Sequence, residues 1–289
     1  MAGLIGIEAC SGAHEWARRF QRLGHEVRIM AARFVAPYRR SGKNDGNDAE
    51  AICEAVRRPS MRFVPVKSAE QQAVLSLHRV RQGIVAERTA TINRVRGLLA
   101  EFGVVLANRP VEVRRAAAAC AGEFPVLARQ AVLDLLSHLR LLDERIAAYD
   151  NEFERLARAS EAASRLMSVP GVGPLTALAT VASVGQAHEF SGGRQFAAWL
   201  GLVPRQWSTG GKTRLGRITK RGDAYLRTLL ILGARAALQM AARRDDRLSR
   251  WAIGLKERVG YHKAVVALAA KNARIVWALL ASGATFQAR

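Results

Sequence analysis

Acidic residues are scarce in this sequence, and their scarcity narrows the choice of partner. The 289 residues include 24 Asp and Glu against 45 Lys and Arg, most of them arginine, so the formal net charge is +21 and the isoelectric point is near 11.3. This excess is larger than solubility requires and indicates a polyanionic partner. Nucleic acid is the first candidate, because arginine makes bidentate contacts with phosphate. An anionic membrane surface fits less well, because no polybasic tail adjoins an apolar anchor.

Cysteine is also rare. The three cysteines, Cys10, Cys53 and Cys120, form no Cys-x-x-Cys pair. This excludes a disulfide framework and a zinc ribbon. We therefore expect buried, reduced thiols in a cytosolic protein.

Several other patterns are missing. The six histidines are scattered and show no His-Glu-x-x-His spacing, and no Gly-x-Ser-x-Gly elbow occurs. These absences argue against a zinc protease and a Ser-His-Asp hydrolase. We also expect no membrane partner, because the start lacks a signal-peptide pattern and no apolar run looks long enough to cross a bilayer.

The 289 residues are enough for two domains or for one domain with a long extension, and the 49% of apolar residues can form a sizeable core. Residues 1–68 suggest a small α/β unit. A buried strand is expected at 4–9 and an alternating strand, with Val27 and Ile29 on one face, at 25–31. Helices are expected at 14–23, where Gly24 ends the helix, and at 49–56. Two short strands cannot form a stable sheet alone, so this unit is expected to be only part of a domain.

Residues 69–160 suggest a long helical region. A helix is expected over 69–102, and apolar residues follow strict 4-3 spacing from Ala128 to Leu156. This spacing favours an antiparallel helical hairpin or an oligomerising coiled coil, although an ordinary amphipathic helix is also possible. Residues 103–127, which include Pro110 and Pro125, are expected to link the two helices.

Residues 161–289 suggest a compact helical domain, with helices at 196–202, 223–240 and 262–280. Near its start, Pro170-Gly-Val-Gly-Pro174 predicts a tight turn between helices. Such a turn matches a helix–hairpin–helix motif, in which backbone amides around Gly171 and Gly173 grip a DNA phosphate without reading the sequence. The alternative is a simple packing corner.

The most basic stretch, residues 204–227, is expected to form a loop. Four glycines allow its backbone to approach a partner closely, and Ser208 and Thr209 precede the pair Gly210-Gly211. Cations and free amides can hold a phosphate that a hydroxyl attacks. A solvated turn between two helices is the alternative. The basic residues of segment 204–227 are Arg205, Lys212, Arg214, Arg217, Lys220, Arg221 and Arg227.

Three acids in the first unit are candidate ligands for a metal ion. Glu8 ends the first expected strand, and Asp45 and Asp48 lie three residues apart at a helix start, where both can face one side. Carboxylates from a strand and a helix could converge on Mg²⁺. Alternatively Asp45 or Asp48 caps the helix, with Asn47 a further capping candidate, and Glu8 is a surface acid.

Taken together, the motifs of this chain resemble one family in the right order over essentially its whole length. In chain order, these motifs are Glu8-Ala-Cys-Ser-Gly-Ala-His, Lys43-Asn-Asp-Gly-Asn-Asp-Ala-Glu, Val169-Pro-Gly-Val-Gly-Pro, Gly201-Leu-Val-Pro-Arg-Gln-Trp-Ser-Thr-Gly-Gly-Lys and Gly216-Arg-Ile-Thr-Lys-Arg-Gly-Asp. Each motif is weak alone, but the set resembles the insertion-sequence transposases of the IS110 family, in its IS1111 branch.

The resemblance implies a mostly α fold with a partial α/β part. It implies an N-terminal RuvC-like domain of the ribonuclease H class, a coiled-coil middle and a C-terminal transposase domain, here 1–68, 69–160 and 161–289. It further implies a DNA recombinase in the bacterial cytoplasm, associated with the nucleoid, that acts as a homo-oligomer (a dimer or tetramer) joined through the coiled coil. A structured bridge RNA would select the donor and target DNA.

The resemblance also implies a four-acid DEDD site with Mg²⁺ and a serine nucleophile. Glu8 matches the second acid, Asp45 and Asp48 match the third and fourth, and Ser208 matches the serine, with Thr209 as the choice of a shifted alignment. The family's first acid, in a Gly-x-Asp pattern, has no counterpart here, so an N-terminally shortened chain is expected. A remnant that binds nucleic acid without catalysis is the alternative.

Overall fold

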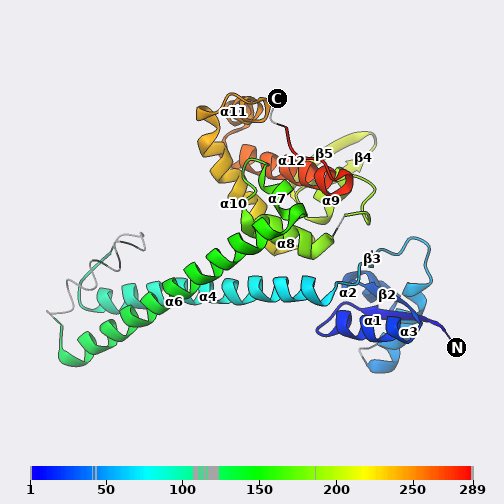
Figure 1. Cartoon of the computed structure of the whole chain (residues 1–289), viewed down its shortest axis with the longest axis horizontal. Helices are drawn as coiled ribbons and strands as arrows, with labels where there is room; N and C mark the ends of the chain where they lie inside the picture. Colours follow the sequence, from blue (N-terminus) through cyan, green and yellow to red (C-terminus); the bar gives the residue numbers. More distant parts are fainter. Residues whose placement is uncertain are drawn as a thin grey trace.

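The N-terminal unit is a three-stranded sheet in the order β1-β2-β3 (Figure 1). The structure, a computed structural model, describes residues 2–40, 42, 44–106, 111, 113, 115, 124–185 and 187–287. β1 (Leu4–Glu8) runs parallel to β2 (Glu26–Met30), and β3 (Phe63–Val64) runs antiparallel to β2. The parallel pair needs a crossover, which α1 (Ala13–Arg22) supplies.

One helix packs closely on this sheet. α2 (Ala32–Val35) and the short η1 (Ala36–Tyr38) lead into α3 (Asp45–Val56). A Cβ added to Gly6 on β1 would lie only 3.0 Å from the side chain of Ile52 and 3.1 Å from that of Val56. The expectation that β1 is buried was wrong, because Leu4 is exposed and the rest of the strand is only partly covered. Within the described residues β1 pairs on one side only, as an edge strand does.

The two long helices lie where they were predicted, at α4 (Ala69–Glu101) and α6 (Val126–Ala159). Arg81 pairs with Asp150 at 2.6 Å and Arg88 with Asp143 at 3.4 Å. The partner recedes by seven residues as α4 advances by seven, so the helices are antiparallel. Ile84 on α4 packs with residues of the 4-3 pattern on α6. The pattern therefore serves a helical hairpin within the chain. Most of the link between them, Pro110 and Cys120 included, lies outside the described residues.

The C-terminal unit is helical, which confirms the expected mostly α character of the chain. Its helices bury one continuous apolar core, in which Phe196, Leu230 and Leu268 are almost completely covered. Leu156 of α6 packs against the same core, so the hairpin and this unit are joined. The helices of this unit are α7 (Glu161–Met167), α8 (Pro174–Val184), α9 (Gly193–Trp199), α10 (Ala224–Met240), η3 (Ala241–Arg243), α11 (Arg247–Val259) and α12 (Tyr261–Ser282).

Two expectations from the missing patterns need correction. α12 is apolar and long enough to cross a membrane by length and composition alone, although no such run was expected. Half of its most apolar window is buried, because it packs on α9, α10 and α11 in the core. The thiols were expected to be buried, but Cys10, between β1 and α1, and Cys53, on α3, are exposed.

Candidate nucleic-acid interface

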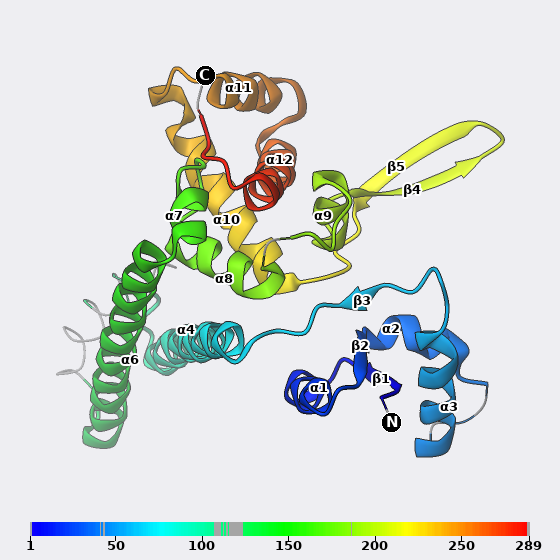
Figure 2. The ribbon, with the colours of Figure 1, turned by 45° about the vertical axis from the view of Figure 1, so that its right-hand side comes forward.

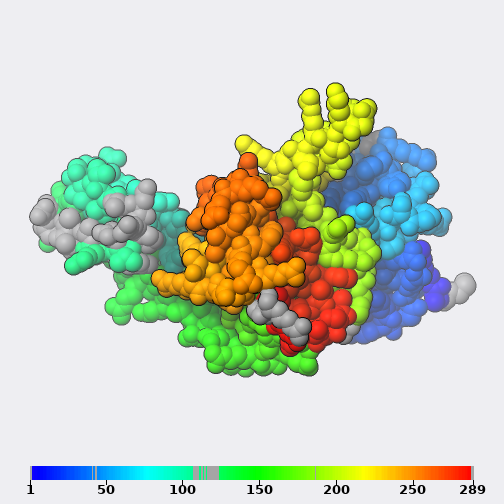
Figure 3. Space-filling view, turned by 90° about the horizontal axis from the view of Figure 1, so that it is seen from above, coloured from blue at the N-terminus to red at the C-terminus, as the bar shows by residue number. Residues whose placement is uncertain are grey.

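The basic segment expected to form a loop folds instead into a β-hairpin, β4 (Pro204–Thr209) and β5 (Lys212–Ile218). Thr209 lies opposite Lys212, so Gly210 and Gly211 alone form the turn. Both have positive φ, 55° and 76°, which this two-residue turn requires and glycine adopts without strain. The hairpin stands out from the body of the protein (Figures 2 and 3).

Alternation along the strands gives the hairpin two faces. Ser208 lies on one face, where Gln206 Nε2 donates a hydrogen bond to its Oγ at 2.8 Å and Ser208 Oγ donates to Thr213 Oγ1 at 3.5 Å. The cross-strand pair Trp207 and Arg214 lies on the other face. That face also carries Thr209 and Lys212.

Ser208 is exposed to solvent, as is every residue of β4. Within the described residues no carboxylate or imidazole is hydrogen-bonded to its Oγ. The hydroxyl is therefore accessible to a phosphate but has no built-in base. Thr209, the other candidate nucleophile, belongs to the opposite face, so one orientation of DNA cannot present the same phosphate to both.

The predicted phosphate-binding cations of the hairpin and its base are all exposed, and none pairs with an acid among the described residues. Asp223, the only acid of the segment, instead caps α10 by accepting a hydrogen bond from the Leu226 amide at 2.9 Å. The positive charge of the hairpin is therefore not compensated, which favours binding of phosphates. Within segment 204–227, the exposed cations that form no ion pair with any described residue are Arg205, Lys212, Arg214, Arg217, Lys220 and Arg221.

The base of the hairpin is held through the backbone. Lys220 has a φ of 53°, rare for a residue with a side chain, and its amide donates to the Gly201 carbonyl at 3.1 Å. A Cβ on Gly201 would lie 2.5 Å from the Arg221 carbonyl oxygen. Arg227 donates to the Leu200 carbonyl at 3.0 Å, so this cation ties α10 to the end of α9. The adjoining Lys220 and Arg221 side chains are exposed and make no hydrogen bond or ion pair with the described part of the chain.

The three candidate acids lie at the N-terminal sheet. Glu8 ends β1, and Asp45 and Asp48 occupy the first turn of α3. The cap of this helix is Asn44, whose side chain accepts from the Asn47 amide at 2.8 Å. Neither Asp45 nor Asn47 is therefore the cap that the sequence suggested. Neither aspartate caps the helix.

Carboxylates are the donors that a divalent ion such as Mg²⁺ prefers, but these acids do not form a ready metal site. Asp48 Oδ1 lies 3.2 Å from Arg39 Nη1. No group of three His, Cys, Asp or Glu side chains that could hold a metal occurs among the described residues. Nor does any hydrogen bond or ion pair there connect Glu8, Asp45 or Asp48 with Ser208.

The turn at 170–174 is packed into the protein. Gly171 has a φ of 86°, and a Cβ added there would lie 2.4 Å from the Gly233 carbonyl oxygen on α10. Asn272 of α12 donates to the Pro170 carbonyl at 2.8 Å. These contacts favour the packing corner over a phosphate grip for Gly171. Gly173 is exposed, with open space around it, and its contact with nucleic acid stays a prediction.

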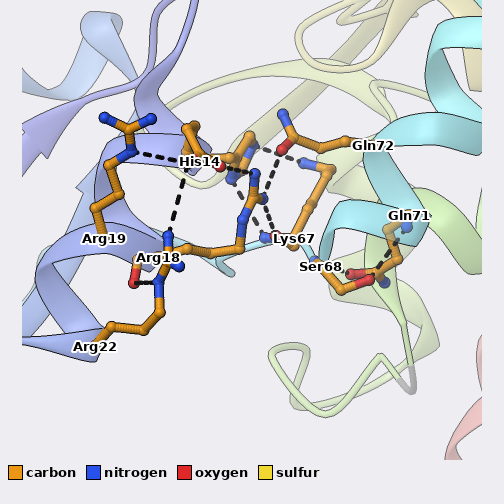
Figure 4. Close-up of polar contacts among 9 residues, drawn as sticks. His14, Arg18, Arg19, Arg22, Lys67, Ser68, Gln71 and Gln72 are labelled. Carbon is orange, nitrogen blue, oxygen red and sulfur yellow. Dashed lines mark hydrogen bonds and ion pairs between the residues drawn. The ribbon is translucent and has the colours of Figure 1, made fainter.

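A polar cluster that sequence reasoning missed joins α1 to the start of α4 (Figure 4). Arg18 of α1 donates to the Lys67 carbonyl at 2.7 Å and to Gln72 Oε1 at 2.5 Å. His14 accepts from the Lys67 amide at 3.3 Å, and its Nε2 lies 3.2 Å from Lys67 Nζ. The partners are 49 to 54 residues apart, so no local pattern could have indicated them.

This cluster borders a cleft of about 290 Å³, which Arg79, Asp223 and Tyr225 also line. Burial, together with the charge of Lys67, lowers the pKa of His14 to about 4. Burial also lowers the pKa of Lys67. His14 is consequently neutral near pH 7, and its single unprotonated nitrogen can accept a hydrogen bond from either the Lys67 amide or the Lys67 ammonium, but not from both. The cleft is a polar joint between the N-terminal unit, α4 and α10.

Comparison with known proteins identifies two family regions. Residues 3–103 match the DEDD transposase model of the IS110 type, described as a transposase. Residues 163–249 match the model described as the transposase IS116/IS110/IS902 family.

Several full-length relatives agree. A "Probable family 20 transposase" of Pseudomonas aeruginosa is 51% identical over 282 residues, which cover 96% of this chain and 83% of that protein. The transposase for insertion sequence element IS1111A of Coxiella burnetii is 43% identical, over 99% of this chain and 79% of that protein. The transposase for IS1328 of Yersinia enterocolitica is 39% identical, over 98% and 85%. The chain therefore belongs to the IS110/IS116/IS902 family of transposases, which are DNA recombinases of insertion sequences.

Proposed function

We propose that this transposase cuts and rejoins DNA strands through a covalent bond to Ser208. The observation that carries the proposal is an exposed serine on a projecting hairpin whose cations have no acidic partners among the described residues. Such a surface attracts the phosphate backbone, and Ser208 places its nucleophilic hydroxyl on one face of the hairpin.

In the proposed step, Ser208 Oγ attacks the scissile phosphorus. A serine–phosphate bond forms, the bond to one DNA oxygen breaks, and the serine proton ends on that oxygen to give a free DNA hydroxyl. Attack by a DNA hydroxyl on the phosphoserine reverses the step and joins the strand. The cations of the hairpin and its base, Lys212 and Lys220 among them, hold the neighbouring phosphates and stabilise the charge that develops.

The family name points to divalent metal use, and we propose Mg²⁺ as the ion and Glu8, Asp45 and Asp48 as ligands. When bound, the ion would withdraw charge from a phosphate. Calorimetric titration of the full chain with Mg²⁺ or Mn²⁺ tests this without reference to activity. Binding should weaken in Asp45→Asn and Asp48→Asn but not in Asp134→Asn, which changes an acid on α6. Equal binding by all of these proteins would exclude the assignment.

The nucleophile is tested by trapping the covalent intermediate. Wild type is incubated with DNA carrying insertion-sequence ends and a divalent ion, and denaturing electrophoresis then separates any protein–DNA adduct. Ser208→Ala should abolish the adduct and strand transfer but retain DNA binding. Thr209→Ala, the matched change on the opposite face, should retain the adduct. An adduct that survives Ser208→Ala and is lost in Thr209→Ala would move the reaction to the other face.

A second candidate function is nucleic-acid binding without catalysis. It is favoured by the lack of a group of three potential metal ligands among the described residues. In that case DNA affinity should fall steeply with salt while no adduct forms with any divalent ion. Adduct formation by the wild-type protein would exclude this candidate.

A guide RNA and self-association complete the proposal. The exposed hairpin cations supply only part of the +21 net charge, which leaves charge for a second polyanion beside the DNA. Sequencing of RNA that copurifies with the chain tests the guide, with random cellular RNA as the contrary result.

Leu133 and Leu141 are exposed on α6 and support self-association through the helical hairpin. Light scattering of wild type and Leu141→Lys measures the mass directly.

A further inference from the structure

Trp207 is exposed to an extent unusual for tryptophan. It lies next to Ser208 on β4, and 57% of its surface is accessible to solvent. The strands around it pair with each other and project from the body of the protein, in agreement with this exposure (Figure 3). Large exposed aromatic side chains on projecting elements are typical of binding surfaces.

One side of the Trp207 ring packs over Gly216. A Cβ added to Gly216 on β5 would lie 2.5 Å from Cζ3 and 2.9 Å from Cη2 of Trp207. The six-membered ring therefore occupies the space where any other residue would place its side chain. Within the described residues no aromatic ring or cation packs on Trp207. The surface of the indole turned away from Gly216 is available for a partner.

The surroundings specify the chemistry of that partner. Arg214 lies directly opposite Trp207, and Lys212 follows on the same face, both without an acidic partner in the described part of the chain. An open aromatic surface beside cations that track a backbone is the arrangement that binds single-stranded nucleic acid, by stacking on bases and pairing with phosphates. An apolar protein partner would leave these cations desolvated and unpaired.

We propose that Trp207 stacks on an unpaired base of the DNA substrate while Arg214 and Lys212 hold its adjoining phosphates. The proposal extends the proposed function of Ser208, which lies on the other face of the same hairpin. DNA is favoured over RNA because the chain belongs to a transposase family and Trp207 adjoins the candidate nucleophile. The hairpin then acts as a wedge, with the strand to be cut on the Ser208 face and a displaced base on the Trp207 face.

The test uses the full chain and DNA oligonucleotides that carry 2-aminopurine, a fluorescent base, in either an unpaired bubble or a full duplex. Divalent ions are omitted so that no strand is cut. The unpaired probe should bind with a change in fluorescence caused by stacking on indole. Trp207→Ala should weaken binding of the bubble roughly 5- to 100-fold, the range expected for one stacked base. Binding of the duplex should change much less.

Further variants separate stacking from other effects. Gly216→Val keeps the indole but fills the space over residue 216 that the indole occupies, so this variant should lose the fluorescence change as Trp207→Ala does. Trp207→Phe should keep part of the fluorescence change. Trp16→Ala is the matched control, because Trp16 on α1 is exposed to a similar degree, 54%. Because the hairpin projects from the core, the melting temperature should stay unchanged in the hairpin variants.

Three outcomes would overturn the stacking proposal: wild-type affinity of Trp207→Ala for the bubble, an equal loss for bubble and duplex, or a fluorescence change only with RNA of the same sequence. Failure of the nucleophile assignment would appear in the adduct experiment alone, so the two failures can be told apart.

Discussion

The hydroxyl of Tyr225 lies 2.9 Å from Nδ1 of His78, a contact that joins α10 to α4 across 147 residues of sequence. His78 is almost completely buried and stacks on Phe153 of α6, with ring centroids 4.2 Å apart. Its Nε2 has no hydrogen-bond partner among the described residues. One imidazole therefore connects the helical hairpin to the first turn of the helix that follows the basic segment.

Removing this hydroxyl should destabilise the protein. Tyr225→Phe keeps the ring but leaves Nδ1 of a buried imidazole without its partner, so we expect a loss of about 1–3 kcal/mol in the free energy of unfolding. Denaturant unfolding followed by circular dichroism measures the loss. Tyr261→Phe is the control, because the Tyr261 hydroxyl makes no hydrogen bond with the described residues. An equal effect of both changes would refute a specific role for the Tyr225 contact.

The same imidazole should make stability depend on pH. Burial, with a smaller effect of Arg81, lowers the pKa of His78 to about 4, against 6.5 in an unfolded chain. Between pH 6.5 and 4 the unfolded state binds the proton and the folded state does not, so stability falls as the pH falls. Across this window the loss is up to about 3 kcal/mol for His78. Above pH 6.5 both states are neutral and the effect disappears.

Urea unfolding at a series of pH values between 4.5 and 7.5 measures this slope. The lowered pKa of His14 acts in the same direction. His78→Leu removes the titrating group and should flatten the slope, although it also lowers stability at every pH. His262→Gln, a change at an exposed position on α12, should leave the slope as it is in wild type. A slope unaffected by His78→Leu would mean that other groups cause the acid sensitivity.

Arg18 should hold the N-terminal unit in place. Its guanidinium bridges α1 to the Lys67 carbonyl and to Gln72, where α4 begins. Arg18→Ala should therefore increase hydrogen exchange and proteolysis around residues 64–72 while the C-terminal core keeps its protection. Arg19→Ala is matched closely, because Arg19 lies on the same helix and pairs with the same Glu15 but does not reach α4. Equal protection in the two variants would show that the bridge does not hold the units together.

The sequence was most informative where signals are local. α4 begins one residue after Ser68, which forms a capping box with Gln71, and it continues without proline to Glu101. The 4-3 pattern of α6 likewise predicted either an antiparallel hairpin or an oligomerising coiled coil, and the ion pairs of Arg81 with Asp150 and of Arg88 with Asp143 show the hairpin. In both helices a few residues within one or two turns decide the conformation, so a single sequence is enough to find them.

The candidate site was harder to predict, for two physical reasons. β4 and β5 bury no apolar face, so they lack the alternation by which strands are usually found, and Gly210-Gly211 was the sole hairpin signal. The joint of His14 with Lys67 depends on tertiary contact between distant residues. The choice of Ser208 rested on family resemblance; what the structure adds is that Ser208 and Thr209 lie on opposite faces.

The last prediction concerns the turn at 170–174 and separates packing from DNA contact. A Cβ on Gly233 would lie 1.8 Å from the Gly171 carbonyl oxygen, a backbone atom that cannot move aside cheaply. Gly233→Ala should therefore destabilise the C-terminal unit by about 3 kcal/mol, at the upper end for overpacking, despite the better helix propensity of alanine. Gly254→Ala is the matched control within α11, because nothing lies within 4 Å of the added Cβ. It should raise stability by about 0.5–1 kcal/mol.

The exposed glycine of the turn completes this test. Gly173→Ala meets nothing within 4 Å, so it should leave thermal stability nearly unchanged. If the turn also grips a phosphate, this change should weaken DNA binding and reduce its dependence on salt. If the turn is only a packing corner, DNA affinity should match that of wild type. The contacts of Gly171 with Gly233 and of Pro170 with Asn272 account for that part of the turn by packing, so we expect the predicted phosphate contact, and the loss of affinity, at Gly173 alone.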